Sequence, residues 1–153
     1  MSWQSTTGGA NITERLTATH RELRAGYDRL FGLVERFRPR EARLASAELK
    51  TRLAMHQRLE EVVVYPLFDG APSIRRATAT MRHEHRLLLE AAEAIDEALA
   101  QGDDEALAQW RGRLAAVMPE HHLKEELLLF PRVDALLSDA ERYHVLERLG
   151  EPA

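Results

Sequence analysis

Apolar residues recur at alternating steps of three and four along most of this chain, the spacing that places them on one face of an α-helix. Short segments containing Pro, Gly or Asp separate the periodic stretches. Long helices are predicted from residue 11 to about 39, over roughly 41–69, from 73 to 102 and from 103 to about 137, with a short helix over 138–149. Short connections favour antiparallel neighbours. The pattern therefore predicts an all-α fold, an antiparallel up-down-up-down four-helix bundle forming one domain over 11–149.

Residues that favour helix ends mark several of these boundaries. Asn11 and Ser138 each stand three residues before a glutamate, the spacing of a capping box. Ser73 is a candidate N-cap for the third long helix, and Gly102 is expected to close it. Pro39 is expected to end the first helix or force a tight turn.

The second half of the chain repeats the first at an offset of 65 residues. His20, His56 and Glu60 correspond in this register to His85, His121 and Glu125. Each His/Glu pair spans four residues, so its two side chains share one helix face. A second acid, an apolar run and an aromatic residue followed by proline come after each pair. The repeat predicts two helix hairpins related by a pseudo-twofold axis.

These six residues stand at positions that the helical pattern assigns to the bundle interior. Burying carboxylates and imidazoles without partners would cost several kcal/mol each, whereas a bound cation would use them as ligands. The chain has no cysteine, so thiolate sites and iron–sulfur clusters are excluded. Four imidazoles and two carboxylates suit iron, manganese or zinc better than calcium or magnesium. We therefore expect two metal ions, each with two histidines, bridged by the two glutamates.

The other histidines receive different interpretations. His83 is two residues from a predicted ligand and should point to the opposite side of its helix. His122 stands four residues before Glu126, so this pair is an alternative to the predicted pair one residue earlier. The repeat offset favours the earlier pair and leaves His122 beside the ligands. His144 lies outside the four long helices.

Together these motifs resemble the hemerythrin family, specifically the bacterial hemerythrin-like or HHE cation-binding domains. The resemblance extends from about residue 20 to 131, and the segment His-His-Leu-Lys-Glu-Glu at 121–126, with Phe-Pro at 130–131, is its most specific part. It implies a non-haem di-iron centre with two bridging carboxylates. The implied ligands are His20 and His56 for one iron, His85 and His121 for the other, and Glu60 and Glu125 as bridges.

The chain differs from the oxygen-carrying members of that family. Those have a His-x-x-x-His pair on the third helix, whereas the residues four positions from His85 are Met81 and Leu89. One histidine fewer leaves a coordination position open to water, another protein oxygen or a small molecule. Tyr27, two turns beyond His20 on the same face, either lines this space or packs in the core. Simple reversible oxygen carriage is therefore not expected.

We accordingly expect a di-iron protein that binds or reacts with O2, NO or peroxide, with catalytic turnover left open. The alternative is an iron- or oxygen-responsive protein that folds on metal binding and contacts another protein. A net charge of -4 gives no electrostatic case for nucleic acid or an anionic membrane surface. Residues 1–10 show no signal-peptide pattern and are expected to form a flexible arm. No apolar run is long enough to span a membrane, so a cytoplasmic location is the default expectation.

Overall fold

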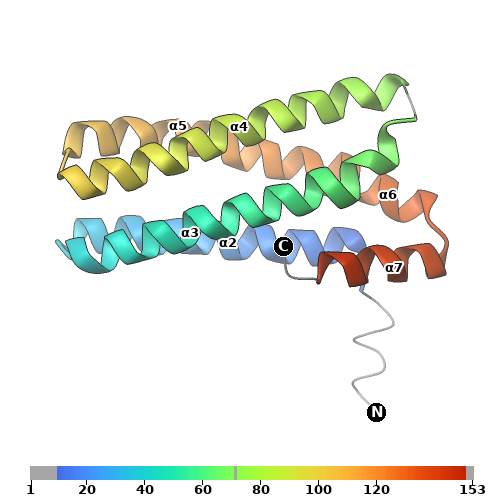
Figure 1. Cartoon of the computed structure of the whole chain (residues 1–153), viewed down its shortest axis with the longest axis horizontal. Coiled ribbons are helices and arrows are strands. Elements are labelled where there is room, and N and C mark those ends of the chain that lie inside the picture. Colours follow the sequence, from blue (N-terminus) through green and yellow to red (C-terminus); the bar gives the residue numbers. More distant parts are fainter. Residues whose placement is uncertain (1–9, 71, 151–153) are drawn as a thin grey trace, which may run out of the picture.

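In the computed structural model, which describes residues 10–70 and 72–150, four long antiparallel helices form a bundle (Figure 1). They are α2 (Ile12–Glu35), α3 (Pro39–Leu59), α4 (Pro72–Gln101) and α5 (Asp104–Lys124), followed by the shorter α6 (Phe130–Leu136) and α7 (Asp139–Leu149). The described part of the chain contains no strand. The predicted all-α bundle with a short C-terminal helix is confirmed.

The helices after each His/Glu motif are not regular. The π-helix η1 (Glu60–Val64) and the 3₁₀-helix η2 (Tyr65–Phe68) follow α3, and the π-helix η3 (Glu125–Leu129) follows α5. The two π-helices are separated by the same 65 residues as the sequence repeat. The long predicted helices over 41–69 and 103–137 are therefore each divided at the second residue of a His/Glu pair, and π-helical turns of this kind are frequent at functional sites.

Most of the predicted helix ends are confirmed. The Asn11 side chain accepts a hydrogen bond from the backbone N–H of Glu14, and Ser138 forms a complete capping box. Gly102 follows α4 with a φ of +66°, a conformation that glycine adopts without steric cost.

Two boundary predictions and one burial prediction are wrong. Pro39 begins α3 rather than ending α2, because its missing N–H is not needed in the first turn of a helix. Phe37, which the apolar period assigns to the buried face, lies in the preceding turn with a φ of 56° and is exposed. Ser73 is not the N-cap of α4, since that helix already begins at Pro72. The expected arm over 1–10 lies outside the described residues except for Ala10, which is exposed.

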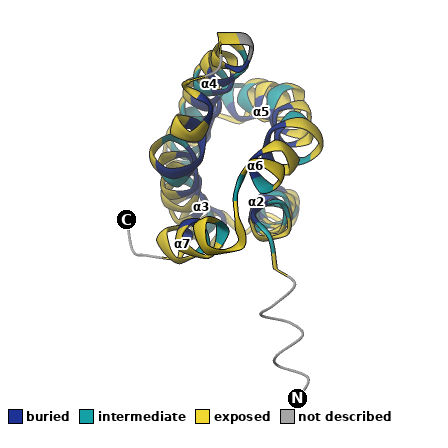
Figure 2. Cartoon of the chain, turned by 90° about the vertical axis from the view of Figure 1, so that its right-hand side faces the viewer, coloured by how far each residue is buried: buried dark blue, intermediate teal, exposed yellow. Residues whose placement is uncertain are grey.

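The helices bury their inner surfaces (Figure 2), and the buried apolar residues form two clusters. One cluster fills the end of the bundle with the α2–α3 and α4–α5 turns and includes Leu23, Leu53 and Met118. The other fills the end with α6 and α7 and includes Leu16 and Val63. On α2, His20 lies between a residue of each cluster, so the predicted ligand layer is enclosed by apolar side chains at both ends.

The C-terminal segment is fixed to the start of the bundle by one carboxylate. Asp134 accepts hydrogen bonds from the backbone N–H groups of Ile12 and Thr13 at 3.0 and 2.9 Å, and it also contacts Arg142 of α7. The negative charge lies at the N-terminus of α2, where the helix dipole favours it. None of the described helices has the length and apolarity needed to cross a membrane.

Candidate metal centre

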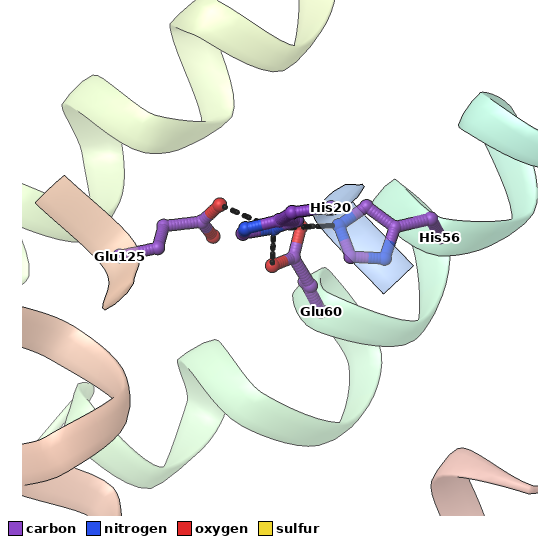
Figure 3. Close-up of side chains that lie close together, drawn as sticks. All are labelled: His20, His56, Glu60 and Glu125. Carbon is purple, nitrogen blue, oxygen red and sulfur yellow. Dashed lines mark hydrogen bonds and ion pairs between the residues drawn. The ribbon is translucent and has the colours of Figure 1, made fainter. Parts of the chain in front are cut away.

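The six predicted ligands converge in the middle of the bundle, and each is at most 5% exposed. Every long helix contributes. The histidines His20, His56, His85 and His121 come from α2, α3, α4 and α5 in that order, and Glu60 and Glu125 are the first residues of η1 and η3. Figure 3 shows four of the six, with the His20 ring directed between the Glu125 carboxylate and the His56 ring.

The ligand-type atoms form two groups that share both carboxylates. The groups are His20, His56, Glu60 and Glu125, and Glu60, His85, His121 and Glu125, with the ligand atoms of each group within 4.8 Å of one another. Glu60 Oε1 lies 3.1 Å from His56 Nε2 and 3.2 Å from His85 Nε2, so this one oxygen contacts both groups. The division into two pairs of histidines matches the one that the hemerythrin resemblance implies.

Three of the four rings are held from behind by carboxylates. The Nδ1 atoms of His20, His85 and His121 lie 3.0, 2.9 and 3.1 Å from Glu126, Glu61 and Glu84, respectively. When Nδ1–H donates to an outer carboxylate in this way, Nε2 is the ring nitrogen whose lone pair faces the centre. The Nδ1 atom of His56 has no such bond among the described residues.

Without a cation nearby, the two shared glutamates would repel each other if both were ionised. Burial, reinforced by the charge of Glu125, raises the pKa of Glu60 well above its ordinary value. Burial also opposes ionisation of Glu125, but close contacts with His121 and His20 outweigh it and hold the pKa of Glu125 well below its ordinary value. Two carboxylates this close cannot both ionise at low cost. The pair is electrostatically suited to additional positive charge between its members.

The same centre has unused acceptor atoms. Both carboxylate oxygens of Glu60 and the Oε1 atom of Glu125 are buried and receive no hydrogen bond from the described residues. Burial lowers the pKa of His56 to about 4 and that of His85 to about 3, so both rings are neutral at physiological pH and can offer a lone pair. Buried neutral imidazoles beside unsatisfied carboxylate oxygens form a donor set that fits a divalent or trivalent metal.

Of the two alternatives for Tyr27, packing in the core is the one that the structure supports, and a different tyrosine lies at the centre. Tyr27 packs in the apolar cluster beside Phe31, with ring centroids 6.2 Å apart. Tyr65 instead donates a hydrogen bond to Glu125 Oε2 at 2.6 Å, and its hydroxyl lies 3.1 Å from His85 Nε2. The sequence feature that could have indicated Tyr65 was the 65-residue repeat, because Tyr65 has a hydroxyl where the corresponding aromatic residue, Phe130, has none.

His122 lies next to the centre without facing the shared carboxylates. Its ring is buried and stacks on the His20 ring, with centroids 3.7 Å apart and planes at 5°. Its Nδ1 atom has no hydrogen-bond partner among the described residues. Together with His20 and Glu126, it forms a third group of closely spaced ligand-type atoms. The alternative pair is thus on the outer side of His20.

Of the histidines outside the centre, His83 and His144 are both exposed, as expected from their positions.

Comparison with known proteins adds a family assignment to this geometry. No curated protein and no solved structure was found that matches the chain. The family model described as the hemerythrin HHE cation binding domain matches residues 11–133, which include all six candidate ligands. Because this match covers most of the 153 residues, the chain belongs to the hemerythrin HHE cation-binding domain family.

Proposed function

We propose that this protein is a non-haem di-iron protein that binds or reacts with a small ligand such as O2, NO or peroxide. The observation that carries the proposal is the buried pair Glu60 and Glu125, which has unsatisfied oxygens and is surrounded by four imidazoles. An apolar bundle gains nothing from this layer unless a cation compensates the burial of its charges. The family assignment independently supports cation binding.

The ligands would be divided as the two groups divide them. His20 and His56 would hold one ion, His85 and His121 the other, and both glutamates would be shared. Iron in these positions would supply the redox change and the open coordination that a small ligand requires. The donor set alone does not distinguish iron from manganese or zinc, because all three accept imidazole and carboxylate ligands.

The chain's own residues set the conditions for such a ligand. The outer carboxylates fix the ring orientations, and the two apolar clusters keep bulk water from the centre. The Tyr65 hydroxyl is a neutral donor next to the second group, and burial raises the pKa of Tyr65 above its ordinary value, so the phenol stays protonated. It can hold a proton, or turn its hydrogen bond from Glu125 to a ligand bound beside His85.

A surface groove offers a route to the other group. It lies between α2 and α3 and is lined in part by His56, whose Nδ1 atom has no carboxylate partner among the described residues. Arg15 and Arg52 line it together with Glu22, so its cationic side chains outnumber its acidic one. This balance favours neutral or anionic ligands over free cations. The groove therefore supports a small-molecule ligand of the kind proposed.

The first test is the metal content per chain after expression in iron-supplemented medium, measured before any chelator is added. The expected result is about two irons per chain. The visible absorption of this sample should then change on addition of O2, NO, peroxide or azide. A folded protein without metal would contradict the proposed centre. An iron-loaded protein whose absorption spectrum does not change with any of the four ligands would contradict the proposed reactivity.

A second function, metal-dependent sensing, is favoured by the position of the polar layer between two apolar clusters. If loading of this layer stabilises the bundle, the folded surface becomes available to a partner only when metal is present. The expected result is a melting temperature that rises with metal loading. A melting temperature independent of metal would contradict sensing through folding without affecting the ligand-binding proposal.

A further inference from the structure

The C-terminal helix α7 covers only one half of the repeated bundle. Val145 and Leu149 of α7 are buried in the cluster that contains Ile12, Leu16 and Val63, and α7 contacts α2 and η1. In Figure 2, α7 lies beside α2 and α3, and among the described residues no helix has the corresponding place beside α4 and α5.

The α7 seat is the surface of α2 and η1 that α7 covers. The 65-residue repeat identifies the corresponding surface in the second half of the chain. Ile12, Leu16, Val63 and Val64 correspond to Ala77, Met81, Leu128 and Leu129. All four of these counterparts line one groove of about 350 Å³ between α4 and η3. No described helix covers this groove. As a result, Leu128 is 66% exposed, whereas its counterpart Val63 is 4% exposed.

Two more leucines project beside this groove. Leu123 and Leu127 are 53% and 65% exposed, and they border a hollow that also includes Leu128. Because Leu123 and Leu127 line the same hollow, they form two neighbouring exposed aliphatic side chains, as Val145 and Leu149 are two neighbouring aliphatic side chains of α7. The molecule therefore presents an apolar ridge directly next to an apolar groove that corresponds to the α7 seat.

We propose that a second copy of this chain covers the groove, so that the protein forms a twofold dimer through α5 and η3. A surface with a ridge and a matching groove side by side is self-complementary, as an interface between identical partners must be. Leu123 and Leu127 of each copy enter the groove of the other. The dimer is independent of the proposed metal chemistry, because none of these side chains belongs to the candidate ligands.

The charges on this face fit an antiparallel arrangement of the two copies. Glu120 borders the ridge at one end of the leucine cluster, and Arg132 borders the groove at the other end. When two copies pack antiparallel, Glu120 of one lies near Arg132 of the partner subunit, and the pair is formed twice. A parallel arrangement would instead oppose like charges, which is unfavourable.

The test is sedimentation equilibrium of the full, metal-loaded chain between about 1 µM and 1 mM, because small helix-pair interfaces of roughly 1,000 Å² or less give weak association. The apparent mass should rise from one chain to two. Leu127→Glu should weaken association at least about tenfold, because it places a charge in an apolar contact. Leu44→Glu is the matched control, since Leu44 is 74% exposed at the opposite end of the bundle, and it should leave association unchanged.

Charge reversal at exposed side chains provides a second, independent test of association, because such changes are not expected to impair folding. Glu120→Arg and Arg132→Glu should each weaken the dimer, and the double variant should restore it, because the reversed pair regains opposite charges. A wild-type chain that remains a monomer at the highest concentration would overturn the proposal, even if the groove binds a helix of another protein. A dimer that neither Leu127→Glu nor the charge reversals weaken would overturn it as well.

Discussion

The two halves of the metal centre have the same ligand types and different surroundings. Each half supplies two histidines, a shared glutamate and an outer carboxylate, and Glu126 contacts His20 as Glu61 contacts His85. The aromatic rings also correspond, since Phe130 lies 5.6 Å from His20 and Tyr65 lies 5.5 Å from His85 between ring centroids. The repeat thus extends beyond the candidate ligands to the packing around them.

Three corresponding positions break this symmetry. Tyr65 provides a hydroxyl that Phe130 lacks, and Glu84 supports His121 where the first half has Thr19 beside His56. The third difference is a buried imidazole, His122, which corresponds in the repeat to Gln57. The second half therefore has more hydrogen-bonded support, and the first half is closer to a surface groove. We infer that two ions in this centre would be chemically inequivalent.

The largest expected effect comes from removing a carboxylate that both halves use. Glu60→Ala should reduce metal content from about two ions per chain to near zero, because Glu60 belongs to both groups. Elemental analysis of protein purified without chelator measures this directly. Glu48→Ala, an exposed change on the preceding helix α3, should keep both ions. Retention of one full ion by Glu60→Ala would show that the halves bind independently and that the carboxylate is not shared.

A smaller effect, confined to one half, is expected at Glu84. Glu84→Gln weakens the hydrogen bond that orients His121, so the affinity of the second position should fall about 10- to 100-fold while the first stays unchanged. Chelator competition should then resolve one tight and one weak ion. Thr19→Val is the matched control at the corresponding position, where the hydroxyl bonds only to the backbone carbonyl of Arg15, and it should change neither affinity. An equal loss at both positions would contradict the inequivalence of the halves.

The next effect is that of the hydroxyl present in only one half. Tyr65→Phe removes the donor to Glu125, and the free energy of unfolding should fall by about 1–3 kcal/mol because a buried acceptor loses its partner. Denaturant titration of matched, metal-loaded samples measures the change. Tyr27→Phe changes a buried tyrosine away from the centre and should cost less. If both variants were equally stable, the Tyr65 hydrogen bond would contribute nothing specific to the centre.

Much of this arrangement could be predicted because a helical period fixes which residues face the interior. His56 and Glu60 are four residues apart on a face otherwise occupied by leucine and valine, so their burial and their convergence followed from the sequence. The repeat then placed a second such pair opposite the first. The structure brings these residues together as the pattern indicated, and their role as metal ligands stays a prediction that metal analysis will test.

The remaining features depend on departures from that period. Each His/Glu pair is followed by a π-helical turn, which changes the rotation per residue and so changes the direction of every later side chain. Counting in α-helical turns from His20 led to Tyr27, whereas the tyrosine at the centre, Tyr65, comes from another helix and lies beyond such a turn. The stacking of His122 on His20 is a contact between helices that no spacing along one helix could indicate.

The smallest expected effect comes from replacing His122, whose side chain can be exchanged with that of its counterpart in the repeat. Burial lowers its pKa to about 2, so the folded protein keeps the ring neutral while the unfolded chain takes up a proton below about pH 6.5. Stability is therefore lost as the pH falls through this window, by up to about 1.4 kcal/mol per pH unit for this one group. His122→Gln gives this position the residue of its counterpart in the repeat, Gln57, and removes this contribution. Denaturant midpoints at pH 7 and pH 5.5 should differ less in the variant than in the wild type.

The reciprocal change, Gln57→His, should have the opposite sign. Gln57 is buried with neither amide atom hydrogen-bonded to the described residues, so an imidazole there would also be neutral in the folded protein and protonated in the unfolded chain. Its stability should fall more steeply between pH 7 and pH 5.5 than that of the wild type. If both exchanges left the pH dependence unchanged, the buried histidine would not be a source of acid sensitivity. The asymmetry between the halves would then be confined to Tyr65 and Glu84.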